Sequence, residues 1–394
     1  MKTRRPTNPR SETTQPPSGR QRGVQRNGPG NAAAQDALQG QAAEATEANT
    51  GWFGAMGSTL SELFHLMGGG EGRDLSREGT ITDPRGKGAV TVASAIEEAR
   101  AADGSFAAFL MQRYGFQPRI DEHRAPDTDT LRVMVPGLNT PEPEASRRTA
   151  LYADVQGQPM MHLHNGTYLD TQLPAPDQLD YASAALTRIG VQETELMRQL
   201  EALLSGALSG AEPSDVHAIL YSDSTIGGTR AIANFRANEI RRRIAALPPS
   251  RRRSAREDVT AEVDALLREH LFVELHGNAT GDLPAGPRYM VWTDTEDQMT
   301  HTELPWGGQL GRDGQNRDSD ADAVYVDYDG PFSGGDAHNL AAGGIHVVRA
   351  TLEANGVQTT EALWEKARRG EEIVVPEGVK GDVSELWDPA NAPR

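Results

Sequence analysis

The stretch VHAILYSDSTIGGTRAIANF, residues 216–235, decides the fold that this sequence predicts. Its first seven residues form a largely apolar run with the length of a buried strand. The polar residues that follow indicate a tight turn, and the pattern from 226 to about 247 indicates a helix. A strand that passes through a polar turn into a helix is the repeating unit of an α/β fold.

The chain on both sides repeats this alternation between strand and helix. Five further short runs have strand character: 131–136, 159–165, 271–277, 288–293 and 323–329. Further helical patterns lie near 91–103, 105–114, 143–155, 177–207, 254–270 and 339–355. The sequence therefore predicts an α/β fold in which a mainly parallel sheet carries helices on both faces.

The whole chain is expected to divide into four parts. Residues 1–50 have almost no large apolar side chains, which favours a disordered head that could act as a secretion signal. Residues 51–88 combine an amphipathic helix with a Gly-rich linker, and this helix is expected to dock on protein because its polar face lacks Lys and Arg. The α/β domain is placed at 89–380 and a C-terminal tail at 381–394.

Composition excludes several classes of protein. Of 394 residues, 37% are hydrophobic, which suffices for a large core, and no apolar run reaches the length of about 18 residues that a transmembrane segment needs. The absence of cysteine excludes disulfides, Cys-ligated metals and a cysteine nucleophile. The net charge is +6 over residues 1–30 and −23 over residues 31–394, so no nucleic-acid partner is expected for the acidic body.

Three side chains at predicted strand ends have the chemistry for acyl transfer. Ligands of open α/β sheets bind at the carboxyl ends of the strands, and Ser224, Asp297 and His338 each follow a different run. The order serine, aspartate, histidine is that of a triad in which the histidine takes the serine proton and the aspartate orients the imidazole. Backbone N–H groups of Thr225 and of Gly137 or Leu138 are expected to face the oxyanion.

Five segments between 130 and 355 support this interpretation by their order and context. They are VMVPGLNTP, MMHLHNGT, HAILYSDSTIGGTRAIANF, LPAGPRYMVWTDTEDQM and DAHNLAAGGIHVVRATL. In these segments the sequence resembles the α/β-hydrolase superfamily: an oxyanion strand and loop, the next strand, a nucleophile elbow, an acid-bearing strand and a histidine loop. The resemblance implies an α/β-hydrolase-like fold and a serine esterase or lipase-like activity, with Ser224 as nucleophile, Asp297 as acid and His338 as base.

The turn departs from the usual small-x-Ser-x-small pattern of that superfamily. Ile226 stands at the second small position of an elbow centred on Ser224, and Gly227 comes one residue late. Ser222 is therefore the alternative nucleophile, and Ser224 could instead serve as the N-cap of the following helix. Four residues are alternatives for the acid and base: Asp294, Glu296, His301 and His346.

No metal or other cofactor is expected. His162 and His164 share one strand face without an evident third ligand, so packing at a strand end is favoured over a metal pair. The aspartates from 318 to 329 match part of a calcium-loop pattern, but Ala323 replaces its glycine. The Arg clusters at 241–243 and 251–256 are interpreted as a solvated helix end, with an anionic head group or a localisation signal as the alternatives.

Two functions are compatible with these features. The favoured one is a serine hydrolase that cleaves an ester or acyl bond, with lipid, acyl and carboxyl esters as the candidate substrates. The alternative is a non-catalytic hydrolase-like scaffold that binds a protein in a host cell. The polar head suggests a protein exported by a bacterial type III system, with a secretion chaperone or a host protein as partner, and the alternative location is the cytoplasm.

Overall fold

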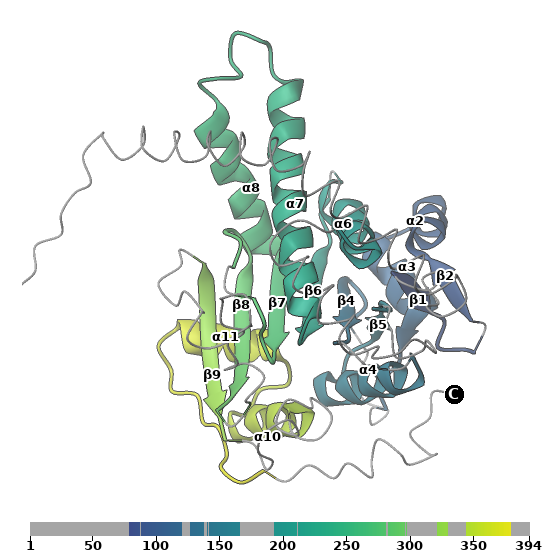
Figure 1. Cartoon of the computed structure of the whole chain (residues 1–394), viewed down its shortest axis with the longest axis vertical. Helices are drawn as coiled ribbons and strands as arrows, with labels where there is room; N and C mark the ends of the chain where they lie inside the picture. Colours follow the sequence, from purple (N-terminus) through teal and green to yellow (C-terminus); the bar gives the residue numbers. More distant parts are fainter. Residues whose placement is uncertain are drawn as a thin grey trace, which may run out of the picture. The chain divides into compact units, whose positions relative to one another are not determined.

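The computed structural model describes residues 79–86, 88–119, 127–137, 140, 142–165, 193–210, 212–280, 283–295, 297, 321–329 and 344–379. Within them lies one seven-stranded sheet in the order β3-β5-β4-β6-β7-β8-β9 (Figure 1). Its strands are β3 (Gly115–Phe116), β4 (Thr130–Val135), β5 (Met160–His162), β6 (Asp215–Tyr221), β7 (Leu271–His276), β8 (Arg288–Asp294) and β9 (Asp322–Tyr328). β3 is antiparallel to β5, and the other neighbours pair in parallel. The predicted mainly parallel sheet is confirmed.

Eight described helices accompany the sheet, in the part of the chain from 92 to 368. They are α2 (Val92–Ala101), α3 (Phe106–Tyr114), α4 (Glu142–Gln156), α6 (Glu195–Leu208), α7 (Ser224–Ala246), α8 (Arg256–His270), α10 (Ile345–Ala354) and α11 (Thr360–Arg368). None of the helices in the described ranges is both long and apolar enough to cross a membrane.

Each face of the sheet has its own core because side chains alternate along a strand. Leu131, Val133 and Leu220 belong to the core that α2, α3, α6, α7 and α8 cover. Ile219 and Trp292 belong to the core that α4, α10 and α11 cover. Helices on both faces were predicted, and the two cores confirm it.

The order of the strands creates a switch point between β4 and β6. From β4 the chain passes through α4 to β5 on one side, whereas from β6 it passes through α7 and α8 to β7 on the other side. The two connections leave in opposite directions, and ligands of open α/β sheets bind at the carboxyl ends of the strands at such a point. Any ligand site of this sheet is expected there.

The folded part starts earlier than the sequence analysis expected. β1 (Thr80–Thr82) pairs antiparallel with β2 (Ala89–Thr91), so residues assigned to the linker belong to a small two-stranded sheet. Ile81 has no exposed surface and bridges to Leu163 next to β5. The expected disordered head and the helix at 51–67 lie outside the described residues.

Candidate functional site

Ser222 forms the turn between β6 and α7 at the carboxyl edge of the sheet. Its φ of 59° is positive, which among the described residues other than glycine occurs only here. Such a backbone is uncommon in serine and persists only where the surroundings determine it. Ser222 N donates to the carbonyl of His276 (2.9 Å), and the N–H and Oγ1 of Thr225 both donate to the carbonyl of Ser222, at 3.0 and 2.6 Å. The Ser222 side chain is half-buried.

Ser224 points into the protein as the first residue of α7. Its Oγ accepts a hydrogen bond from Tyr221 N (2.8 Å) and lies 2.9 Å from the carbonyl oxygens of Val135 and Tyr221, to which it can donate. Only 1% of the residue is exposed. The Ser224 hydroxyl is therefore engaged by the backbone of β4 and β6, whereas Ser222, the alternative nucleophile, occupies the turn itself.

Gly137 brings the loop after β4 against Ser222. A Cβ on Gly137 would lie 2.7 Å from the Ser222 Cβ and 3.0 Å from the Tyr221 carbonyl oxygen. No side chain fits in this space, so glycine is required for the close approach. Gly137 was predicted as an oxyanion residue, and the structure places it beside the turn. Its predicted companion Leu138 lies outside the described residues.

Thr225 has a structural position rather than one exposed at the carboxyl edge of the sheet. Its N–H is bound to the Ser222 carbonyl, and its Oγ1 accepts a hydrogen bond from Ala279 N at 3.0 Å. Thr225 is fully buried. The predicted oxyanion N–H of Thr225 is thus already used to hold the turn.

Asn165 connects the loops that follow β4, β5 and β6. Its Nδ2 donates to the carbonyl of Pro136 (3.1 Å) and lies 3.3 and 3.4 Å from the two carboxylate oxygens of Asp223. Asn165 is itself buried. These contacts place the polar ends of three neighbouring parallel strands together, at the switch point of the sheet.

The predicted acid Asp297 lies just beyond the carboxyl end of β8. β7 separates β8 from β6, so the strand that bears the predicted acid is not a neighbour of the strand that leads to Ser222. Asp297 N donates to the carbonyl of Asp294 (3.2 Å), and both aspartates are buried. Burial raises the pKa of Tyr328 well above its usual value, and the nearby Asp294 and Asp297 raise it further.

The predicted base lies outside the described residues, as do two of the alternatives: His338, His301 and Glu296. The fourth alternative, His346, is the second residue of α10 and is buried. The described residues therefore include the candidate nucleophile and the candidate acid Asp297. The base His338 stays a prediction.

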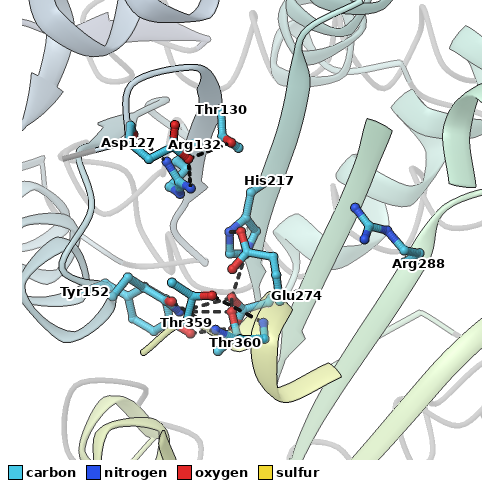
Figure 2. A network of polar contacts seen from close by, with 12 residues as sticks. Asp127, Thr130, Arg132, Tyr152, His217, Glu274, Arg288, Thr359 and Thr360 are labelled. Carbon is cyan, nitrogen blue, oxygen red and sulfur yellow. Dashed lines mark hydrogen bonds and ion pairs between the residues drawn. The ribbon is translucent and has the colours of Figure 1, made fainter. Parts of the chain in front are cut away.

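A buried polar cluster that the sequence analysis missed lies on the face covered by α4 and α11 (Figure 2). His217 of β6 contacts two carboxylates, Glu274 of β7 through Nε2 (2.6 Å) and Glu361 of α11 through Nδ1 (2.7 Å). Tyr152 of α4 donates to the second oxygen of Glu274 at 2.6 Å, and Thr360 donates to the first. Glu274 has no exposed surface, so these contacts replace its hydration.

The cluster holds its charges in the ionised form. Burial alone would lower the pKa of His217, but Glu361 and Glu274 raise it to about 9. Burial would raise the pKa values of both glutamates, but His217 brings each below its usual range. Burial and the neighbouring Glu274 carboxylate raise the pKa of Tyr152 well above its usual value. A positive imidazole between two carboxylates is the arrangement that these directions describe.

His276 links this cluster to the turn. Its Nε2 lies 3.1 Å from the Tyr152 hydroxyl and 3.3 Å from Glu274, while its carbonyl accepts the hydrogen bond from Ser222 N. The ring of His276 stacks on Trp292 with centroids 6.0 Å apart. His276 thus connects the polar cluster, through its side chain, to the backbone of Ser222, through its carbonyl.

The two histidines considered for a metal pair, His162 and His164, are both buried and lie in contact with each other at the end of β5. His162 is fully buried, its Nδ1 lies 3.0 Å from Thr82 Oγ1, and its ring centroid is 5.9 Å from that of His164. Burial, with His164 beside it, lowers the pKa of His162 to about 3. Among the described residues, which include only part of the aspartates from 318 to 329, no three or more His, Asp or Glu side chains are arranged so that they could hold a metal ion.

Comparison of the chain with protein-family models, with curated proteins and with solved structures found no match.

Proposed function

We propose that the protein is a serine hydrolase that cleaves an ester or acyl bond, with Ser222 as its nucleophile. The observation that carries this proposal is the backbone of Ser222, a positive φ in a strand-to-helix turn at the switch point of a parallel sheet. A sharp turn of this kind presents a serine hydroxyl at the edge of the sheet in α/β-hydrolases. Ser224, two residues later, is already inside the helix and its hydroxyl is bound to backbone.

Centring the elbow on Ser222 removes the conflict with Ile226. The second small position then falls on Ser224, whose short side chain fits and bonds the neighbouring backbone. The first small position falls on Leu220, which is large. Gly228 compensates for it, because a Cβ at 228 would lie 2.3 Å from the Leu220 Cδ1 atom. Because Gly228 of α7 has no side chain, the Leu220 side chain of β6 fits against this helix.

The other roles are proposed from the sequence, since His338 lies outside the described residues. His338 stays the proposed base and Asp297 the proposed acid, with Asp294 as its alternative. The N–H of the residue after a nucleophile usually contributes to the oxyanion hole, which here is the N–H of Asp223. The second N–H would come from the loop that Gly137 begins.

The proposed reaction has two steps. The Ser222 oxygen attacks the acyl carbon while His338 takes its proton, and His338 then gives this proton to the leaving alkoxide. A water molecule next attacks the acyl-enzyme, its proton passing to His338 and from there to the Ser222 oxygen as the carboxylic acid leaves. Asp297 would orient His338 throughout.

Export by a type III system, a secretion chaperone and a host partner remain predictions from the polar head, which lies outside the described residues. The alternative function is a non-catalytic scaffold, and the following experiment distinguishes it from a serine hydrolase.

Hydrolysis of a short-chain p-nitrophenyl ester by the full chain tests the proposal. We expect Ser222→Ala to lower kcat by several orders of magnitude, since a triad nucleophile usually contributes about 10⁴-fold or more. Ser224→Ala should retain measurable turnover if it folds. Equal activity of the wild type and Ser222→Ala would exclude Ser222, and no activity of the wild type on a panel of acyl chain lengths would favour the scaffold.

A further inference from the structure

The helical hairpin of α7 and α8 carries a basic tip on an acidic protein. Residues 241–256, here called the hairpin tip, contain seven arginines and no acidic residue, whereas residues 31–394 as a whole have a net charge of −23. The arginines are Arg241, Arg242, Arg243, Arg251, Arg252, Arg253 and Arg256. In Figure 1 the two helices extend well past the end of the sheet, and the tip is their far end.

Most of these arginines are not neutralised by neighbours. Arg242 and Arg243 pair with Glu239, at 2.6 and 2.7 Å. The other five form no ion pair with a carboxylate anywhere in the described ranges. Arg252 instead donates to the carbonyls of Ala245 and Leu247, both at 3.1 Å, which ties the loop to the end of α7. The acidic residues nearest along α8 are Glu257, Asp258 and Glu262.

The tip stands clear of the acidic body. The last buried residue of α7 is Glu239 and the first buried residue of α8 is Val259. From Glu239 to Ala246 the helix advances by about 10 Å, which exceeds the Debye length of about 8 Å at physiological ionic strength. Repulsion from the body is therefore largely screened at residues 247–253, the far end of the tip, where an anionic surface meets the local positive charge.

The loop is held in one shape before any partner binds. Arg251 N donates to the Pro248 carbonyl (2.8 Å), Ala255 N donates to the Arg251 carbonyl (3.0 Å), and Ser254 Oγ donates to the same carbonyl (3.2 Å). Two consecutive prolines, Pro248 and Pro249, further restrict the backbone. Arg251 and Arg253 are thus presented with little loss of backbone entropy on binding.

We propose that the hairpin tip docks on the surface of an anionic phospholipid membrane. Clusters of four to eight Lys or Arg bind acidic lipid head groups at roughly this charge density. Between the two arginine clusters lies the apolar segment Leu247–Pro249, in which both prolines are exposed. A lipid interface can accommodate such an apolar apex, whereas a phosphodiester backbone cannot. The tip also has no aromatic side chain, the usual stacking platform for single-stranded bases.

Vesicle co-sedimentation of the full chain tests this docking surface. One vesicle preparation is phosphatidylcholine alone, and the other also contains phosphatidylserine. The tip variant is Arg251→Glu, Arg253→Glu and Arg256→Glu combined. A matched control makes the same change of charge at three exposed arginines away from the tip, Arg100→Glu, Arg268→Glu and Arg369→Glu. Circular dichroism and thermal unfolding establish that both variants fold.

We expect the wild type to bind only the vesicles that contain phosphatidylserine, and to be released by high salt. The tip variant should bind about 100-fold more weakly, since each of the three arginines near such a surface contributes roughly a fivefold factor. The control variant should bind like the wild type. The proposal is overturned if the wild type does not bind, or if the two variants lose binding equally. It is also overturned if the tip variant still binds, which would assign the binding to the basic head. Tip-dependent binding of duplex DNA without vesicle binding would assign the tip to nucleic acid.

Discussion

Gly137 lies so close to Ser222 that a Cβ on Gly137 would come within 2.7 Å of the Ser222 Cβ. The contact joins the loop after β4 to the turn after β6, the two segments that meet at the switch point of the sheet. Because the Tyr221 side chain and carbonyl lie on the same side, at 2.9 and 3.0 Å, an added methyl group has no way to avoid both.

Gly137→Ala is therefore expected to displace the loop or the turn. The predicted result is a large loss of ester hydrolysis together with a free energy of unfolding lowered by about 1–3 kcal/mol, a typical value for overpacking. Denaturant unfolding and ester hydrolysis measure the two effects. Full activity with unchanged stability would show that the turn tolerates the methyl group.

The two adjacent glycines of α7 should respond differently to alanine. At Gly228 a Cβ would meet Leu220 at 2.3 Å, whereas at Gly227 the nearest atoms, on Leu196 and Met197, are 3.6 and 3.7 Å away. Gly228→Ala should destabilise the protein. Gly227→Ala should be neutral or stabilise it by up to about 1 kcal/mol, because alanine favours the helix. Equal effects of the two substitutions in thermal unfolding would contradict the close packing of α7 on β6.

Ser222→Ala and Ser224→Ala should also differ in their effect on the free energy of unfolding. Ser224→Ala removes the hydroxyl that bonds Tyr221 N and the carbonyl of Val135, which leaves buried backbone groups without partners. We expect a loss of about 1–3 kcal/mol in the free energy of unfolding. Ser222→Ala should lose less, since its side chain is half-buried at the edge. A larger loss for Ser222→Ala would mean that its hydroxyl is the structural one.

The cluster around His217 predicts how stability depends on pH. The pKa of His217 is raised to about 9, so its contribution is complete below about pH 6.5 and is lost as the pH rises toward 9. This difference corresponds to about 3 kcal/mol of folding free energy. Glu274 and Glu361 have lowered pKa values, so their contribution is present above about pH 4.5 and is lost below it.

Thermal unfolding of His217→Gln measures this contribution. The variant should be less stable at neutral pH, because the buried Glu274 and the half-buried Glu361 lose their counter-charge. Its Tm should fall less than that of the wild type between pH 6.5 and 9. His270→Gln, at a partly exposed histidine that also contacts an aspartate, is the matched control and should keep the alkaline loss. An unchanged alkaline slope in His217→Gln would show that the imidazole is not the titrating group.

Most of the sheet could be predicted from the sequence because each of the longer strands is a largely apolar run. All six predicted runs correspond to strands, from β4 to β9, and Tyr221 ends β6 within one residue of the prediction. β1 and β3 have only three and two residues, too few for any periodicity to appear. The register of the turn could not be predicted either, since Ser222 and Ser224 differ only in backbone angle and burial.

The polar cluster was missed for a related reason. Glu274 and His276 alternate with apolar residues in LFVELHG, a pattern that equally fits a strand face open to solvent. What buries Glu274 is α11, a helix that no sequence pattern had indicated, together with His217 from the neighbouring strand. The available signal was an ionisable residue inside each of two apolar runs, His217 in 216–222 and Glu274 in 271–277.

Labelling with a fluorophosphonate probe, followed by mass spectrometry of the modified peptide, tests the central claim most directly. The probe reacts covalently with an activated serine, so it reports the nucleophile without knowledge of the substrate. The account predicts that the wild type is labelled on Ser222, that Ser222→Ala is not labelled, and that folded Ser224→Ala still is. Labelling on Ser224, or no labelling of the folded wild type, would contradict it.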